Sequence, residues 1–360
     1  MAACPSMSDL PEHLIRRILL AATDHADLLT HVSVCARVCA DWRQAVRTSA
    51  AYSGGPWVAL DWSHALPEVF AADAAGRAER ARVLKQISRW LRLATTIGSD
   101  WRGHLSFIRA NIGDKGAKAL GAALQVWPAP LALNDMDLNG NQLTVAGLAP
   151  IIAALRRGFA GDGLVRLDVQ DNPGLGDAGV TLLAGALPPE LRKLNIGNMG
   201  CGDQGMVAIA AALPALSHLA ELYCDSNTAV GQAGWAALGA ALPQMSALTC
   251  LQIRDCGAMG DAGAAALAAG LPGAPVLREL YLRQSHINRE NVLTLPHGID
   301  DAGARALAAV LPRCAPLRHL ELTNHSYGAA GLEALNAAAA QHGMVRIHHP
   351  VDLESSDEDW

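Results

Sequence analysis

The residue types that usually carry catalysis or bind metal form no working pattern in this sequence. The eight cysteines contain no Cys-x-x-Cys pair, and His342, His348 and His349 have no Cys or carboxylate pattern beside them to complete a metal site. The chain also lacks a Gly-x-x-x-x-Gly-Lys phosphate loop, a His-Glu-x-x-His motif and a Gly-x-Ser-x-Gly motif. The sequence therefore predicts a protein that is not an enzyme and needs no metal or other cofactor.

Residues suited to protein recognition recur instead, alternating with leucines, as in Glu221-Leu222-Tyr223 and Glu279-Leu280-Tyr281. Alternate side chains of a strand point to opposite faces, so these polar residues share one face and the leucines the other. The alternation predicts a partner-binding face made of Arg166, Asp168, Glu221, Tyr223, Gln252, Arg254, Glu279, Tyr281, Arg283 and Glu321. Tyr and Arg are enriched at interface hot spots, which makes Tyr223, Arg254, Tyr281 and Arg283 the leading candidates. The alternative is a solvated polar sheet without a partner.

An internal repeat positions these strands. Seven segments share the pattern Leu-x-x-Leu-x-Leu, a turn, a Gly-rich step and an Ala/Leu helix, beginning at Leu133, Leu164, Leu191, Leu219, Leu248, Leu277 and Leu317. A degenerate earlier copy runs from Leu105 to Leu124. A strand and a helix in every repeat predict an α/β solenoid, a horseshoe with parallel strands inside and helices outside.

Further positions repeat in phase with the strands. The position after each strand turn holds Asn141, Asn172, Asn227 and Cys256, with Met199 as a departure, and Asn there is expected to bond turn backbone groups. Gly-Asp steps such as Gly202-Asp203 precede the helices, and each Asp is expected to cap the helix that it precedes. Helices are expected over Gly263–Leu271 and Gly303–Leu311, with Pro243, Pro272 and Pro312 marking the return to the next strand.

The repeat pattern resembles the leucine-rich repeats of the ribonuclease-inhibitor class, and the resemblance covers roughly Leu105 to Gly343. One copy departs from it, because an insertion of roughly Ser285 to Gly298 follows Leu282. Insertions of this kind map to loops at one edge of a solenoid, where they bind partners or are simply tolerated.

A different segment precedes the repeats. Apolar residues at positions 10, 14, 15, 18 and 19 follow helical spacing, and Val38-Cys39-Ala40-Asp41-Trp42-Arg43 closes the segment. It resembles an F-box, whose pattern begins Leu-Pro and ends Val-Cys-x-x-Trp-Arg. The stretch from Leu28 to Trp42 is longer than in that family, and Val34-Cys35 offers a second register. The alternative is an apolar helical cap over the open end of the solenoid.

F-box proteins are substrate receptors of the SCF class of cullin–RING ubiquitin ligases. The resemblance implies that this chain docks on a Skp-type adaptor, and through it on a cullin, while the repeats bind a protein substrate that the sequence does not identify. The adaptor-binding residues that it implies are Leu10, Pro11, Leu14, Ile15, Ile18, Leu28, Val38, Cys39 and Trp42. Bacterial effectors with similar repeats would share this function.

Two alternative functions differ in class. One is a scaffold or inhibitor that uses no adaptor. The other, weaker one is a GTPase activator of the Ran type, because the repeats of such activators look similar. These activators need an Arg or Asn at the site of GTP hydrolysis, and the sequence identifies no residue for this role.

Composition sets the remaining limits. The formal charge of −6 lies mostly in the last nine residues, which leaves a near-neutral body and argues against nucleic-acid binding. The start of the chain has no signal-peptide pattern and no stretch reaches 18 apolar residues, so we expect reduced thiols, no membrane partner, and residence in the cytoplasm or nucleus.

The expected organisation has four parts. They are an F-box-like helical module (8–50), a linker and N-terminal cap of the solenoid (51–104), the leucine-rich-repeat domain (105–343) and an acidic disordered tail (344–360). Within the second part, a short strand is expected over Trp57–Trp62 and a capping helix over Arg77–Leu93.

Overall fold

The computed structural model describes residues 45–47, 57–61, 102–109, 111–125, 133–159, 163–256, 259–284, 298–343 and 346–348. The chain forms two compact units that divide between Val169 and Gln170. The expected adaptor-binding residues Leu10 to Trp42, the expected helix at 77–93, the insertion at 285–297 and the tail from 349 lie outside the described residues.

The first unit contains two antiparallel strands followed by parallel ones. Strand β1 (Ala45–Arg47) pairs antiparallel with β2 (Trp57–Asp61), which lies where the sequence predicts a strand. Parallel pairing then joins β2 to β3 (Arg102–Ser106), β4 (Asp135–Asp137) and β5 (Arg166–Asp168). Helices α4 (Gly113–Gln125) and α5 (Val145–Leu155) pack side by side, so the degenerate copy at 105–124 is a strand and helix like the others.

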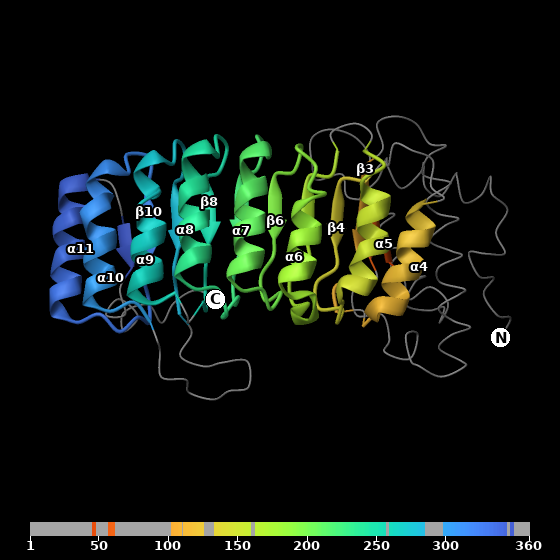
Figure 1. Ribbon diagram of the computed structural model, residues 1–360. Helices are drawn as coiled ribbons and strands as arrows, with labels where there is room; N and C mark the ends of the chain where they lie inside the picture. Colours follow the sequence, from red (N-terminus) through yellow and green to blue (C-terminus); the bar gives the residue numbers. More distant parts are fainter. Residues whose placement is uncertain are drawn as a thin grey trace, which may run out of the picture. The chain divides into compact units, whose positions relative to one another are not determined.

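The second unit alternates helices and short parallel strands in chain order (Figure 1). Its helices are α6 (Gly176–Ala184), α7 (Asp203–Ala212), α8 (Gln232–Ala241), α9 (Gly260–Ala268), α10 (Asp301–Val310) and α11 (Ala329–His342). Its strands are β6 (Lys193–Asn195), β7 (Glu221–Tyr223), β8 (Cys250–Gln252), β9 (Glu279–Tyr281), β10 (His319–Glu321) and β11 (Arg346–His348), each paired in parallel with the next. The predicted parallel-strand and helix architecture of leucine-rich repeats is therefore present.

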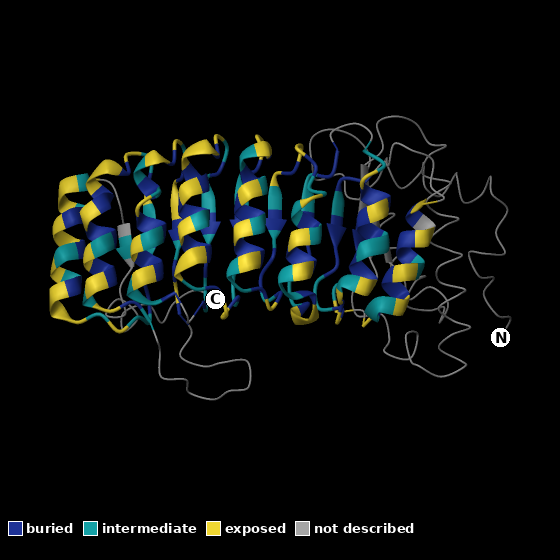
Figure 2. Ribbon diagram, in the orientation of Figure 1, coloured by how far each residue is buried: buried dark blue, intermediate teal, exposed yellow. Residues whose placement is uncertain are grey.

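The core of each unit lies between the strands and the helices, whose inward faces are buried (Figure 2). One core-facing residue in every strand from β3 to β10 is at most 2% exposed: Leu105, Met136, Leu167, Leu194, Leu222, Leu251, Leu280 and Leu320. Helices supply small residues to this layer, and Gly239 and Gly270 approach so closely that a Cβ on Gly270 would overlap the Gly239 carbonyl. Ala-rich and Gly-rich helices are thus required by the short distance between neighbouring repeats.

The expected helix ends need one correction. Helices α9 and α10 begin three and two residues before the predicted Gly263 and Gly303, because the Gly-Asp step is the first helical turn. They end at Ala268 and Val310, and the prolines then lie inside short 3-10 turns: η5 (Leu213–Ala215), η6 (Leu242–Gln244), η7 (Leu271–Gly273) and η8 (Leu311–Arg313). Another such turn, η4 (Pro173–Leu175), precedes α6.

Buried asparagines bond backbone groups of their own turns, as the sequence predicts, and they also bond the preceding repeat. The Asn227 amide donates to the carbonyls of Ile196 and Cys224 at 2.8 and 3.1 Å, and its oxygen accepts from the Met199 N–H at 3.0 Å. Asn141 does the same in the first unit, donating to the Phe107 and Leu138 carbonyls. Each of these amides satisfies backbone groups of its own turn and of the preceding repeat.

The predicted role of the Gly-Asp steps was wrong in one respect, because each Asp caps the next helix rather than its own. Asp203 lies in the first turn of α7, and its Oδ1 accepts from the N–H groups of Gly231 and Gly234, both at 2.8 Å, at the start of α8. The side chain points across to the neighbouring helix, and a Cβ on Gly234 would lie only 2.9 Å from Asp203 Oδ1. Asp177, Asp261 and Asp301 cap α7, α10 and α11 in the same way.

Histidine replaces asparagine in a later repeat. Nδ1 of His325 accepts from the Ile299 N–H at 3.1 Å, and Nε2 contacts the Leu282 carbonyl. These partners require a neutral ring with its proton on Nε2. Burial lowers the pKa of the His325 imidazole to about 4.

In the part of the chain that the structure describes, every helix is too short or too polar to cross a membrane.

We predict that Asp203→Ala lowers the free energy of unfolding by about 1–3 kcal/mol, because two helix N-terminal N–H groups lose their acceptor. Urea unfolding followed by circular dichroism measures the change. The matched control is Gln204→Ala, at the exposed next position of the same helical turn. Equal effects of the two substitutions would show that the carboxylate does not cap α8.

We also predict that His325 makes the fold sensitive to acid. The unfolded histidine binds a proton below about pH 6.5 and the folded one only below about pH 4, so this contribution to stability is complete above pH 6.5. It is lost progressively as the pH falls towards 4, by about 3 kcal/mol. Urea unfolding at pH 7.5 and 4.5 should show a smaller pH dependence for His325→Asn than for the wild type.

The control for this measurement is His218→Asn, which changes an exposed histidine and should leave the pH dependence unaltered. If His325→Asn also retains the full pH dependence, the buried imidazole is not its source.

Candidate functional site

The strands present polar side chains on the face that the helices leave open. In the second unit the residues on either side of each central leucine lie in register: Lys193, Glu221, Cys250, Glu279 and His319 in one column, and Asn195, Tyr223, Gln252, Tyr281 and Glu321 in the other. Glu279 is exposed and the others are partly exposed, whereas the leucines between them are buried. The sequence-predicted residues Glu221, Tyr223, Gln252, Glu279, Tyr281 and Glu321 therefore share one face.

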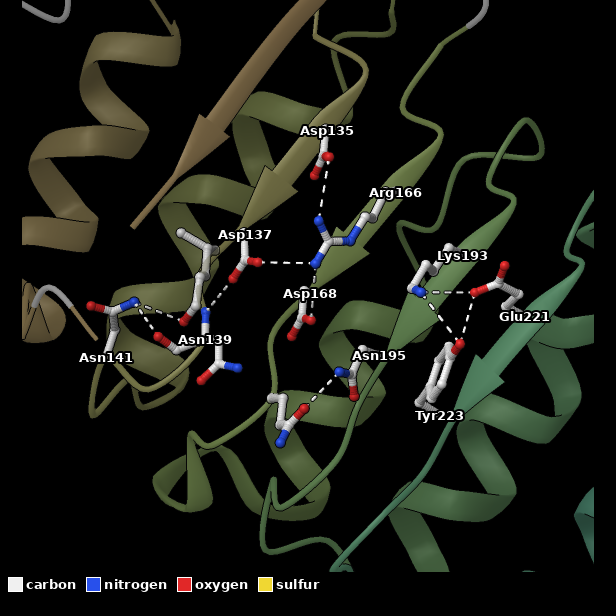
Figure 3. Close-up of polar contacts among 12 residues, drawn as sticks. Asp135, Asp137, Asn139, Asn141, Arg166, Asp168, Lys193, Asn195, Glu221 and Tyr223 are labelled. Carbon is white, nitrogen blue, oxygen red and sulfur yellow. Dashed lines mark hydrogen bonds and ion pairs between the residues drawn. The ribbon is translucent and has the colours of Figure 1, made fainter. Parts of the chain in front are cut away.

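An arginine surrounded by three carboxylates lies on the strand face of the first unit (Figure 3). The Arg166 guanidinium is 3.5 Å from Asp135, 3.1 Å from Asp137 and 3.5 Å from Asp168. Asp168 is only 5% exposed, whereas the Arg166 side chain is 33% exposed, so Arg166 is the more accessible of these two predicted contact residues.

The charges of this cluster do not balance, because one cation faces three acids. Burial and the neighbouring Asp168 raise the pKa of the Asp137 carboxyl to about 6. Asp137 also accepts from the Asn139 N–H at 3.0 Å, which fixes its orientation. Arg166 therefore holds together a group of acids that would otherwise repel one another.

A lysine, a glutamate and a tyrosine form a second cluster, in the second unit (Figure 3). Lys193 Nζ lies 2.8 Å from Glu221 Oε2 and 3.3 Å from the Tyr223 hydroxyl, and 4.6 Å from the centre of the tyrosine ring. The Tyr223 hydroxyl donates to Glu221 at 2.8 Å. Burial and this hydrogen bond raise the pKa of the Tyr223 phenol, so it stays protonated and remains a donor.

A third group surrounds Arg254. Its guanidinium lies 5.2 Å from the centre of the Tyr281 ring and 3.9 Å from Glu321, and its backbone N–H donates to Asp225 at 2.8 Å. Gln252 also donates to Asp225. The Tyr281 ring is 4.9 Å from the ring of His319, so a cation and two rings meet on the open side of β8–β10. Arg283, the remaining predicted residue, is exposed just beyond the end of β9.

Four face residues lie outside the predicted site although alternation marks them: Lys193, Asn195, Cys250 and His319. Cys250 pairs with Glu221 and Glu279 on the neighbouring strands and is partly exposed, but a cysteine beside a leucine reads as apolar in sequence. Lys193 is marked by the same alternation, but no sequence signal shows that it contacts a tyrosine on the next strand. Strict alternation around each central leucine finds all four.

The predicted adaptor-binding residues lie outside the described residues, so their role stays a prediction: Leu10, Pro11, Leu14, Ile15, Ile18, Leu28, Val38, Cys39 and Trp42. Within the described part of the chain, His, Cys, Asp and Glu side chains form no group of three or more that could hold a metal ion.

Comparison with known proteins identifies the repeats. A family model for the leucine-rich repeat matches residues 164–184 and 244–268. No curated protein matches the chain.

Two solved structures are distantly similar. The leucine-rich repeat-containing protein LegL7 from Legionella pneumophila is 16% identical over 81% of each chain, with a TM-score of 0.42. A chain of the Rad7 and Elc1 complex in yeast is 18% identical over 68% of this chain and 56% of that one, with a TM-score of 0.30. At these TM-scores neither structure adds to what the repeats themselves show.

We predict that Arg166→Met destabilises the first unit by about 2–4 kcal/mol at pH 7.5, because it leaves three carboxylates without their counter-charge. The loss should be smaller at pH 5, where protonation of Asp137 relieves the repulsion. Urea unfolding at both pH values measures it, with the exposed Arg192→Met as control. A loss that does not depend on pH would contradict this account of the cluster.

Proposed function

We propose that this chain is a non-enzymatic receptor that binds a protein substrate through the strand face of its leucine-rich repeats. We further propose that Leu10 to Trp42 dock on a Skp-type adaptor, which makes the chain the substrate-recognition subunit of an SCF-type cullin–RING ubiquitin ligase. The two parts of the proposal have different support and are tested separately.

The observation that supports substrate binding is the contrast between the two faces of the second unit. The strand face carries Tyr223, Arg254 and Tyr281 in partly exposed positions, the residue types that dominate interface energetics. The exposed positions of α7–α9 carry mainly uncharged small residues: Gln204, Val207, Ala211, Gln232, Ala233, Ala236, Ala240, Ala262, Ala265 and Ala269. In these central repeats, the groups suited to recognition by hydrogen bonds and charge therefore lie mainly on the strand face.

The face is also held in place before any partner arrives. Tyr223 and Tyr281 donate to glutamates on their own strands, and Lys193 and Arg254 lie against the tyrosine rings. Side chains fixed in this way lose less conformational freedom on binding than free ones, which favours affinity.

Ubiquitin transfer requires nothing catalytic of this chain. A receptor that holds a substrate near the loaded enzyme raises the effective concentration of the target lysine and makes no bond itself. The adaptor part of the proposal rests on the sequence pattern from Leu10 to Trp42. A scaffold or inhibitor would use the same strand face without an adaptor, so adaptor capture separates the two functions.

The test is capture of a purified Skp-type adaptor by the full chain. We predict that Leu10→Ala with Pro11→Ala lowers adaptor affinity by at least about tenfold, because apolar contacts at the start of the motif are lost. Tyr223→Ala with Tyr281→Ala should leave adaptor affinity unchanged. Surface plasmon resonance gives both affinities, and circular dichroism confirms that each variant is folded.

If the folded wild-type chain does not bind the adaptor, the ligase role is wrong and the scaffold or inhibitor function takes its place. If the Leu10/Pro11 variant binds as well as the wild type, the adaptor contact lies elsewhere in the chain.

A further inference from the structure

The tripeptide Glu-Leu-Tyr occurs on two strands of the second unit in equivalent positions. In β7 it is Glu221-Leu222-Tyr223 and in β9 it is Glu279-Leu280-Tyr281. In both strands the leucine is fully buried and the tyrosine hydroxyl donates to the glutamate, at 2.8 Å in β7 and 3.2 Å in β9. The two strands therefore present the same acid and the same ring on the open face.

The strands that precede them differ at one position. In β6, Lys193 pairs in register with Glu221, and its ammonium group contacts the glutamate, the tyrosine hydroxyl and the ring. In β8 the residue in register with Glu279 is Cys250. The Glu-Leu-Tyr tripeptide of β9 thus has the same acceptor groups as that of β7. The position equivalent to Lys193 is occupied by a cysteine, which is short and uncharged.

The cysteine does not supply the missing charge. Burial, together with the negative charges of Glu279 and Glu221, raises the pKa of the Cys250 thiol to about 12, so it is neutral at physiological pH. No ion pair of Glu279 occurs in the described part of the chain, whereas Glu221 is paired with Lys193 and Glu321 with Arg254. Glu279 is also exposed, so its charge faces solvent and is accessible to a binding partner.

Arg254 does not replace the lysine either. Arg254 lies two residues after the end of β8, and its backbone N–H donates to Asp225. Its guanidinium lies near the Tyr281 ring and Glu321. It therefore leaves the carboxylate of Glu279 without a counter-charge.

We propose that Glu279, Tyr281 and Cys250 form a socket for the ammonium group of a lysine side chain that the protein partner presents. The chain's own Lys193 is the template for the polar contacts: its ammonium group donates to the Glu221 carboxylate and to the Tyr223 hydroxyl. The Tyr281 ring already lies beside Arg254 and His319, so the Glu279 carboxylate and the Tyr281 hydroxyl are the groups that would hold the incoming ammonium. Lys193 reaches over β7 to contact Glu221 and Tyr223. Because a cysteine is several atoms shorter than a lysine, Cys250 does not reach over β9 in this way, and we propose that an incoming lysine side chain takes the equivalent position. The socket depends on the proposed function only for the partner that supplies the lysine.

The test uses the full chain labelled with 3-fluorotyrosine, which gives one fluorine signal for each of its four tyrosines. Tyr→Phe variants assign the signals. The probe is Nα-acetyl-lysine methylamide, and its Nε-acetylated form, which has no charge, is the control probe. The Tyr281 signal should shift saturably with the first probe and not with the second.

Substitutions at the socket separate it from general attraction to acidic surfaces. Glu279→Gln should weaken the affinity of the lysine probe by about tenfold, as expected when a charged hydrogen-bond partner is lost. Cys250→Lys should abolish the response of Tyr281, because the chain would then fill the socket itself. Lys193→Cys should create a second socket, seen as a new response of the Tyr223 signal.

The unperturbed signal of Tyr327 and the circular dichroism spectrum report that each variant is folded. The socket is refuted if Tyr281 does not respond, if both probes act equally, or if Cys250→Lys responds like the wild type. It is refuted as a lysine site if Nα-acetyl-arginine methylamide binds as tightly. Because no partner or adaptor is needed, these outcomes are independent of whether the proposed ligase role is correct.

Discussion

The need to satisfy buried backbone groups across repeats governs this structure. One repeat contains a short strand, a turn and a helix, and these elements cannot satisfy all of their own backbone N–H and carbonyl groups. Side chains of the neighbouring repeats therefore bond the remaining groups. Asn227 bonds the backbone of the preceding repeat and Asp203 caps the helix of the following one. Removing either partner leaves polar groups buried without bonds, which is why stacking of repeats and folding of one repeat are inseparable.

This constraint also determines where recognition can occur. The asparagines and aspartates lie at the turns and at the starts of the helices, and leucine, or Met136 in β4, fills the core-facing position of the strands from β3 to β10. Only the residues flanking each central leucine remain free to vary in chemistry. A strand three residues long presents few such side chains, so a binding surface has to be assembled from several repeats in register. The Lys193, Glu221 and Tyr223 cluster already combines residues of two strands.

Much of this arrangement could be predicted from the sequence, because period 2 and the repeat fix which residues face outwards. The central leucines, the asparagine positions and the strand face followed from spacing alone. The direction of the aspartate caps did not, since a Gly-Asp step looks the same whether it caps its own helix or the next. The clustering of Asp135, Asp137 and Asp168 around Arg166 also escaped, because contacts between neighbouring strands depend on register and on side-chain direction. His325 took the place of an asparagine with no sequence signal for its two backbone bonds.

The central claim is that the partner binds the strand face rather than the helix face. Site-specific photo-crosslinking in cells tests it most directly, with the photoreactive residue placed at Gln252 on the strand face or at the exposed Ala236 on α8. The account predicts that the same partner protein is crosslinked from position 252 and not from position 236. Crosslinking from position 236 alone would place the binding surface on the helices and contradict the account.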